Sequence, residues 1–138
     1  MKWGAERARE AFAASRVARL ATVDATGQPH LVPVTFAAYD ATVAIAVDDK
    51  PKATRDLKRL WNIADNPRVS LLADEYDDDW ARLWWARADG LARVEHDGPD
   101  WGLARERLVV RYPQYQDTPP EAAIILVTVS RWSGWSFR

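Results

Sequence analysis

Short apolar runs separated by turn residues recur along the chain and predict a mainly β structure. The runs expected to form strands are residues 17–23, 30–39, 43–47, 68–73, 83–95 and 123–129, the last continuing into the Trp-rich C-terminus. Turn residues stand between them, and Gly27 tolerates the positive φ of a tight turn. Six strands joined largely by hairpins predict a closed or partly split antiparallel barrel with Greek-key-like connectivity.

Three further segments carry a helical periodicity: residues 4–15, 54–64 and 101–111. The second of these helices is expected to turn an apolar face inward, made of Leu57, Leu60, Trp61 and Ala64. The pair Asn66-Pro67 ends it, because proline disfavours helical geometry in the residue before it.

Two residues predict irregularities in the strands. Pro33 cannot donate a ladder hydrogen bond, so its strand is expected at a sheet edge, at a bulge, or without a neighbour at that point. Gly90 lies inside the longest run and predicts a bulge or bend there.

Composition restricts the classes of protein. A chain of 138 residues with 48% hydrophobic residues can form one core, and we expect a single domain over residues 1–138. The chain has no cysteine, and its net charge of −1 argues against a nucleic-acid partner. Since no apolar run reaches the roughly 20 residues of a membrane span and no signal peptide is apparent, a cytoplasmic location is expected.

Hydrolytic and metal chemistry find little support. His30 and His96 are the two histidines, and both are expected in structural or surface roles. There is no G-x-S-x-G, Walker or G-x-G-x-x-G motif. The acidic stretch at residues 74–79 lacks EF-hand spacing, so a solvated loop is expected and no metal site is assigned. No catalytic residue can be named.

The segment between the third and fourth predicted strands is rich in cations: Lys50, Lys52, Arg55, Lys58 and Arg59. Phosphate recognition uses fixed positive charge, and a helix beginning near Thr54 would add its N-terminal dipole. The alternative is that these cations only decorate an exposed helix.

The pattern K-R-x-x-N-I-x-x-N-P-x-V-S-L-L, followed by a strand ending A-D-G, resembles the FMN-binding split-barrel superfamily typified by pyridoxamine 5′-phosphate oxidase. The resemblance extends from Val17 to Phe137. It implies that Lys58 and Arg59 bind the cofactor phosphate, and that Pro33, Val34 and Thr35 contact the ring system. It also implies that Trp85, five residues before Gly90, lies at the ring.

Two departures from that pattern point to one branch of the superfamily. About six extra residues, including Lys50-Pro51-Lys52, precede the basic helix, and D-D-W-x-R-L-W-W leads into the fifth strand. Both resemble an actinobacterial-type branch predicted to use the deazaflavin coenzyme F-420. Lys50, Lys52 and Arg55 then become candidates for its anionic polyglutamate tail.

Consecutive strand residues point to opposite faces, so Trp85 is expected on the cofactor side and Trp84 in the core or a dimer interface. At most one of the two is expected to line a given pocket. Trp132 and Trp135 are candidates for packing across a dimer.

The resemblance implies a homodimer with cofactor sites between subunits, and an F-420-dependent oxidoreductase acting on a small organic substrate. The alternatives are an FMN-dependent oxidoreductase of the same fold, a non-enzymatic flavin- or haem-binding protein, and a dimer without cofactor.

Overall fold

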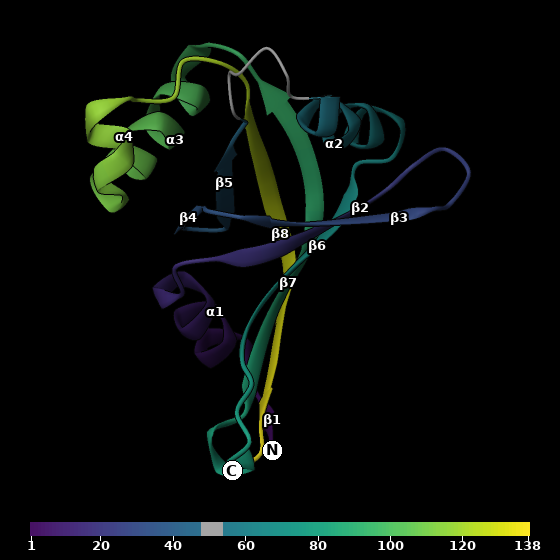
Figure 1. The fold of residues 1–138 in the computed structure, drawn as a ribbon, viewed down its shortest axis with the longest axis vertical. Helices are drawn as coiled ribbons and strands as arrows, with labels where there is room; N and C mark the ends of the chain where they lie inside the picture. The colour runs from purple at the N-terminus through teal and green to yellow at the C-terminus, as the bar shows by residue number, and fades with distance from the viewer. Residues whose placement is uncertain (48–53) are drawn as a thin grey trace.

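One antiparallel sheet organises the molecule, with its strands in the order β3-β2-β6-β7-β8-β5-β4 and β1 pairing with β8 (Figure 1). The structure is a computed structural model that describes residues 1–47 and 54–138, with residues 54–57 described by their backbone alone. Within these ranges it has eight strands: β1 Lys2–Trp3, β2 Ala18–Val23, β3 Pro29–Val34, β4 Ala37–Tyr39, β5 Thr42–Ala46, β6 Arg68–Glu75, β7 Trp84–Glu95 and β8 Ile124–Ser136.

The sequence predicted six strands, so this count was wrong. The two-residue strand β1 was missed, because it is too short to carry an alternating pattern. The predicted strand over residues 30–39 is interrupted at Thr35 and Phe36, and its halves pair with different partners. β3 pairs with β2 at one end of the sheet order, whereas β4 pairs with β5 at the other. The break therefore links the two ends of the sheet order, which gives the partly split barrel.

The predicted irregularities at Pro33 and Gly90 are both confirmed. β3 is the terminal strand of the sheet order, where Pro33 faces Arg19 of β2. The register between β7 and β8 shifts at Asp89/Gly90. A Cβ atom on Gly90 would stand 2.2 Å from the carbonyl oxygen of Thr128, so the close approach of β8 requires glycine.

Four α-helices and one short 3₁₀ helix are present in the described residues: α1 Ala5–Ala14, α2 Thr54–Asp65, α3 Gly98–Arg111, α4 Pro113–Asp117 and η1 Trp80–Arg82. α1 lies against β7 and β8, and α2 lies at the opposite end of the molecule from the two termini (Figure 1). α3 and α4 lie beside β4 and β5 in the same view.

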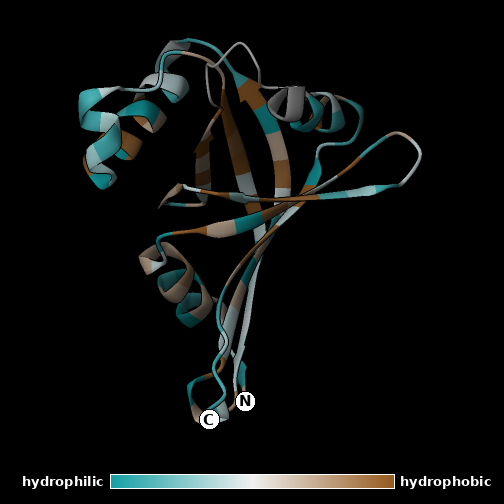
Figure 2. Cartoon of the chain, in the orientation of Figure 1, coloured by the Kyte–Doolittle hydropathy of each residue, from teal (hydrophilic) through white to brown (hydrophobic). Residues whose placement is uncertain are grey.

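The apolar residues form two packed clusters. The larger fills the barrel and includes Phe12 of α1, which packs with Phe36 and Trp132 at ring-centroid distances of 4.7 and 5.3 Å. The smaller lies between α3 and the outer side of β5 and β8, with Leu108 and Leu126 at its centre. Figure 2 shows the corresponding hydrophobic colouring along the first half of β8, in contrast to the alternating colours of α3 and α4.

None of the described helices is long and apolar enough to cross a membrane.

Candidate functional site

The helix α2 presents Lys58 and Arg59 in different directions. Successive helical residues are about 100° apart, so an adjacent pair cannot share one face. The Lys58 side chain is 47% exposed, with its Nζ 3.9 Å from the Asp24 carboxylate. Arg59 is 8% exposed and turns inward. The two predicted phosphate ligands are thus neighbours with one exposed and one buried side chain.

The inward face of α2 differs in part from the one predicted. Leu60 packs against the barrel core as predicted, and the side chain of Leu57 is not described. Trp61 is 61% exposed and Ala64 is also exposed, whereas Arg59, Asn62 and Ile63 are buried. The Asn62 Nδ2 donates a 3.0 Å hydrogen bond to Oγ1 of Thr22, which is fully buried on β2. This partner offsets the cost of burying the amide, and hydropathy alone could not reveal it.

Asp24 organises the β2–β3 turn beside Lys58. Its Oδ1 accepts hydrogen bonds from the Thr26 hydroxyl at 2.7 Å, the Thr26 amide at 2.8 Å and the Gln28 amide at 3.0 Å. The Thr26 hydroxyl, followed by the Gln28 amide, holds the pKa of Asp24 below its usual value. Gly27 has φ 90°, as the turn chemistry predicted. Together, these contacts fix an anionic group next to the exposed ammonium.

The predicted ring-contact segment alternates in exposure. Pro33 and Thr35 are exposed, whereas Val34 is 6% exposed and belongs to the barrel core. The Thr35 hydroxyl lies 3.3 Å from the hydroxyl of Tyr115 on α4. Val34 can therefore offer only backbone atoms to a ligand, while Pro33 and Thr35 can offer side chains.

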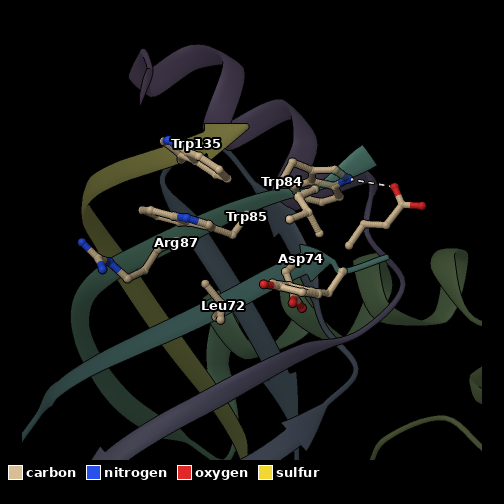
Figure 3. Close-up of a pocket in the computed structure, with 9 residues that line it drawn as sticks. Leu72, Asp74, Trp84, Trp85, Arg87 and Trp135 are labelled. Atoms are coloured by element: carbon tan, nitrogen blue, oxygen red, sulfur yellow. Dashed lines mark hydrogen bonds between the residues drawn. The ribbon is translucent and has the colours of Figure 1, made fainter. Parts of the chain in front are cut away.

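Trp85 borders a pocket of about 320 Å³ at the start of β7, here called the indole pocket. The residues that line it include Leu72, Asp74, Trp84, Trp85, Arg87 and Trp135. Figure 3 shows that they come from three neighbouring strands. Trp85 faces Asp74 on β6 and Trp135 on β8 in the strand register. Long side chains of the pocket thus come from strands far apart in sequence.

Both Trp84 and Trp85 line this pocket, which corrects the prediction that at most one would do so. Trp84 packs against the core cluster and stacks on Trp3, with ring centroids 5.8 Å apart and an interplanar angle of 20°. Its Nε1 donates to the Glu75 carboxylate at 3.2 Å. Because the pocket lies at the end of β7, it can border side chains that leave the strand in different directions.

The charged groups of the indole pocket differ in how fully they are paired. The Arg87 guanidinium donates to Asp89 at 3.1 Å and lies 5.4 Å from the centre of the Trp85 ring, within cation–π range. Asp74 has one long contact, 3.5 Å from its Oδ1 to Arg19.

Trp85 and the inward face of α2 lie apart within one chain. Thr22, the hydrogen-bond partner of Asn62, follows Ala21, and Ala21 pairs with Ser70 of β6. Thr22 therefore lies at the level of Val69 on β6, and Val69 pairs with Gly90 of β7. Five residues of extended strand separate that level from Trp85, a distance of about 17 Å. Trp85 also projects from the sheet face opposite the buried Thr22. The structure therefore does not bring these two predicted parts of the site together in one protomer.

Pro33 and Trp85 do share a face of the sheet. Strand pairing places Pro33 opposite Arg19, Arg19 opposite Leu72, and Leu72 opposite Arg87, so their side chains lie on one face. Trp85 is two residues from Arg87 on β7 and therefore lies on the same face. We call this side of β3, β2, β6 and β7 the open face. Its exposed aliphatic residues are Leu31, Leu72 and Leu91.

The remaining predictions are placed as follows. Trp132 packs on Phe12 inside the chain, whereas Trp135 lies at the indole pocket. Lys50 and Lys52 lie outside the described residues, and the side chain of Arg55 is likewise not described. No group of metal-ligating side chains that could hold an ion occurs in residues 1–47 and 54–138.

Sequence reasoning missed several residues of these regions. Arg87 could have been found, because it shares a strand face with Trp85 at a spacing of two. Leu72 and Trp135 carried no such signal, because strand register decides that they meet Trp85.

A family model described as pyridoxamine 5′-phosphate oxidase matches residues 5–136, and the chain belongs to this family. A FAD-binding protein from Mesorhizobium loti is 23% identical with a TM-score of 0.76, covering 97% of this chain and 95% of its own. The FAD binding protein from Mycobacterium smegmatis is 19% identical with a TM-score of 0.72 and full coverage of both chains.

A heme binding protein from Mycobacterium smegmatis is also similar, with 22% identity and a TM-score of 0.73. The match covers 95% of this chain but 53% of that protein. At these identities the similarity establishes the split-barrel fold. No protein with a curated description matches the sequence.

Proposed function

We propose that the protein is an oxidoreductase that binds a phosphate-bearing flavin-type cofactor and transfers a hydride between it and a small organic substrate. The observation that carries the proposal is Lys58, whose exposed ammonium stands on α2 beside a buried arginine, at the position for which the sequence resemblance implies a phosphate contact. The similar proteins described as FAD-binding support a flavin-type ligand.

The residues fit such a cofactor in three respects. Lys58 supplies a charge that solvent and a phosphate can reach, and its 3.9 Å contact with Asp24 is long enough to be exchanged. Pro33 offers an apolar surface and Thr35 an exposed hydroxyl for a ring system. Arg59 contributes positive charge from beneath, where lower exposure to water strengthens its field. The bound cofactor would supply the redox chemistry, and these residues would bind and orient it.

F-420 is the proposed cofactor, and FMN is the alternative. The preference rests on the sequence, because Lys50, Lys52 and Arg55 add positive charge suited to a polyanionic tail. A protein that binds flavin or haem without turnover is the second candidate function, favoured by the similarity to a heme binding protein.

A homodimer is part of the proposal. The aliphatic residues Leu31 and Leu91 are 66% and 54% exposed on the open face, where apolar surface is suited to an interface. Since Trp85 lies about 17 Å along β7 from the strand level that α2 contacts in one protomer, a shared cofactor site would need Trp85 from the partner subunit. Both the dimer and the assignment of Trp85 to the ring are proposals.

Side-by-side equilibrium titration of purified protein with F-420 and with FMN tests the function. We expect tighter binding of F-420, and a loss of about tenfold in affinity for Lys58→Ala, equivalent to about 1.4 kcal/mol from one charge-assisted phosphate contact. Arg107→Ala, which removes an exposed cation on α3, away from both α2 and the open face, is the matched control. Unchanged affinity in both Lys58→Ala and Arg59→Ala would contradict the phosphate assignment, and binding without turnover of any substrate would favour the second candidate.

A further inference from the structure

The indole pocket shares Trp85 with the proposed ring contact, but its ligand preference goes beyond the proposed function because it can be measured without bound cofactor. We propose that this pocket binds a planar aromatic cation of one or two fused rings. The proposal rests on the pocket's size, its aromatic walls and the pairing of its charged groups.

The volume and walls define the shape of the ligand. A volume of about 320 Å³ lies at the lower end of small-molecule sites, which suits one or two fused rings. Three indoles border the pocket, with Trp85 and Trp135 in facing positions on β7 and β8. Figure 3 shows the side chains of Trp85 and Trp135 on the same side of the sheet, with Leu72 beneath Trp85. Such side chains offer flat, apolar contact to an aromatic ring.

The carboxylates define the charge. Both oxygens of Glu75 already accept hydrogen bonds, one from Arg82 at 3.2 Å and one from the Trp84 indole at 3.2 Å. Among the described residues, by contrast, Asp74 has a single polar side-chain partner, Arg19, at 3.5 Å, which is longer than an ordinary hydrogen bond between charged groups. Asp74 therefore retains acceptor capacity at the pocket wall.

The cation of the pocket does not offset this acidity. Arg87 donates to Asp89, and its guanidinium lies over the Trp85 ring. Its charge is thus directed to groups already in place. A positively charged ligand would gain from Asp74 and from the negative faces of the indoles, whereas an anionic ligand would be repelled by Asp74.

Three probes of nearly constant shape separate charge from stacking: N-methylquinolinium, neutral quinoline and 2-naphthoate. Isothermal titration of cofactor-free protein at low salt should give the tightest binding for the cation and the weakest for the anion. Asp74→Asn should weaken N-methylquinolinium binding about fivefold, the effect of one partly exposed charge pair, and leave quinoline binding nearly unchanged. Higher salt should also weaken binding of the cation.

Matched variants keep the test specific. Asp78→Asn removes an exposed carboxylate of the same acidic stretch that does not line the pocket, and it should leave all three affinities unchanged. Trp85→Leu should reduce binding of all three probes, whereas Trp80→Leu, an exposed indole outside the pocket, should not. Thermal melts establish whether each variant is folded. If Trp85→Leu does not fold, Asp74→Asn by itself tests the proposal.

The proposal is overturned if 2-naphthoate binds as tightly as N-methylquinolinium, if Asp78→Asn weakens the cation as much as Asp74→Asn does, or if no probe binds at millimolar concentration. It is also overturned if binding appears only in a variant made monomeric, because a side chain of a second copy is then the occupant. Flavin titration is a separate measurement. If the protein fails to bind flavin, the outcome of the quinolinium titration still decides this proposal.

Discussion

Trp85 and Trp135 are register partners on adjacent strands, and both side chains border one pocket on the same side of the sheet. They stand 50 positions apart in the chain, with α3 and α4 between them. Antiparallel pairing of β7 and β8 brings them together, which makes the two longest strands both the centre of the sheet and the wall of the indole pocket.

Replacing Gly90 by alanine should destabilise the protein more than the same change at Gly102. In Gly90→Ala the new methyl group would stand 2.2 Å from the Thr128 carbonyl oxygen, so the β7–β8 pairing must shift, at a cost of about 1–3 kcal/mol or more. Gly102→Ala in α3 is the control, because nothing lies within 4 Å of its added Cβ and alanine favours the helix by roughly 0.5–1 kcal/mol. Chemical denaturation measures both changes. Equal stabilities for the two variants would contradict the account of the bulge.

The Tyr112 hydroxyl should contribute to stability through its hydrogen bonds with backbone groups. It accepts a 3.0 Å hydrogen bond from the Phe36 amide, and its proton can be donated to the carbonyl oxygen of Phe36 at 2.8 Å or of Arg16 at 3.0 Å. Tyr112→Phe leaves that buried amide without this acceptor and should lower the free energy of unfolding by about 1–3 kcal/mol. Tyr115→Phe loses an exposed 3.3 Å contact with Thr35 and should change the free energy of unfolding by less than about 0.5 kcal/mol. A similar loss in both variants would disprove the distinction.

Asp24 should make the stability of the protein depend on pH in the acidic range. Its folded-state pKa is lowered by the Thr26 hydroxyl and the Gln28 amide, so its contribution to stability is present above the unfolded-state value of about 4 and is lost as pH falls through the lower folded-state pKa. Asp24→Asn should therefore lower Tm at pH 7, and its difference from wild type should shrink below pH of about 4. Thermal melts across that range measure the effect. A difference that stays constant down to strong acid would refute it.

The open face should control association of the chain. Leu31→Glu and Leu91→Glu each place a charge on an exposed aliphatic position of that face and should shift a dimer toward monomer. Val110→Glu is the control, because this side chain is 73% exposed on α3, away from the open face. Light scattering coupled to gel filtration measures the mass. A wild-type monomer, or dissociation by Val110→Glu alone, would count against the proposed interface.

Local pattern was sufficient where one residue decides the outcome. The turn at Gly27, the terminal position of the strand containing Pro33 and the irregularity at Gly90 all follow from backbone constraints of single residues. The family motif similarly pointed to the split barrel, which the match over residues 5–136 bears out.

Tertiary contacts decided what local pattern could not. Asn62 rather than Trp61 faces inward on α2, because Thr22 of a distant strand supplies a hydrogen-bond partner. The run over residues 30–39 became two strands, because its halves pair with β2 and β5 at opposite ends of the sheet order.

The sequence by itself determined the mainly β class, the positions of most strands and helices, and the cation pair Lys58 and Arg59, because each depends on short-range spacing. Only the tertiary structure decided that one of these cations is buried and the other exposed, and that Trp85 meets Trp135 rather than α2. Helix orientation and strand register set those relationships, and both are fixed by packing between residues far apart in the chain.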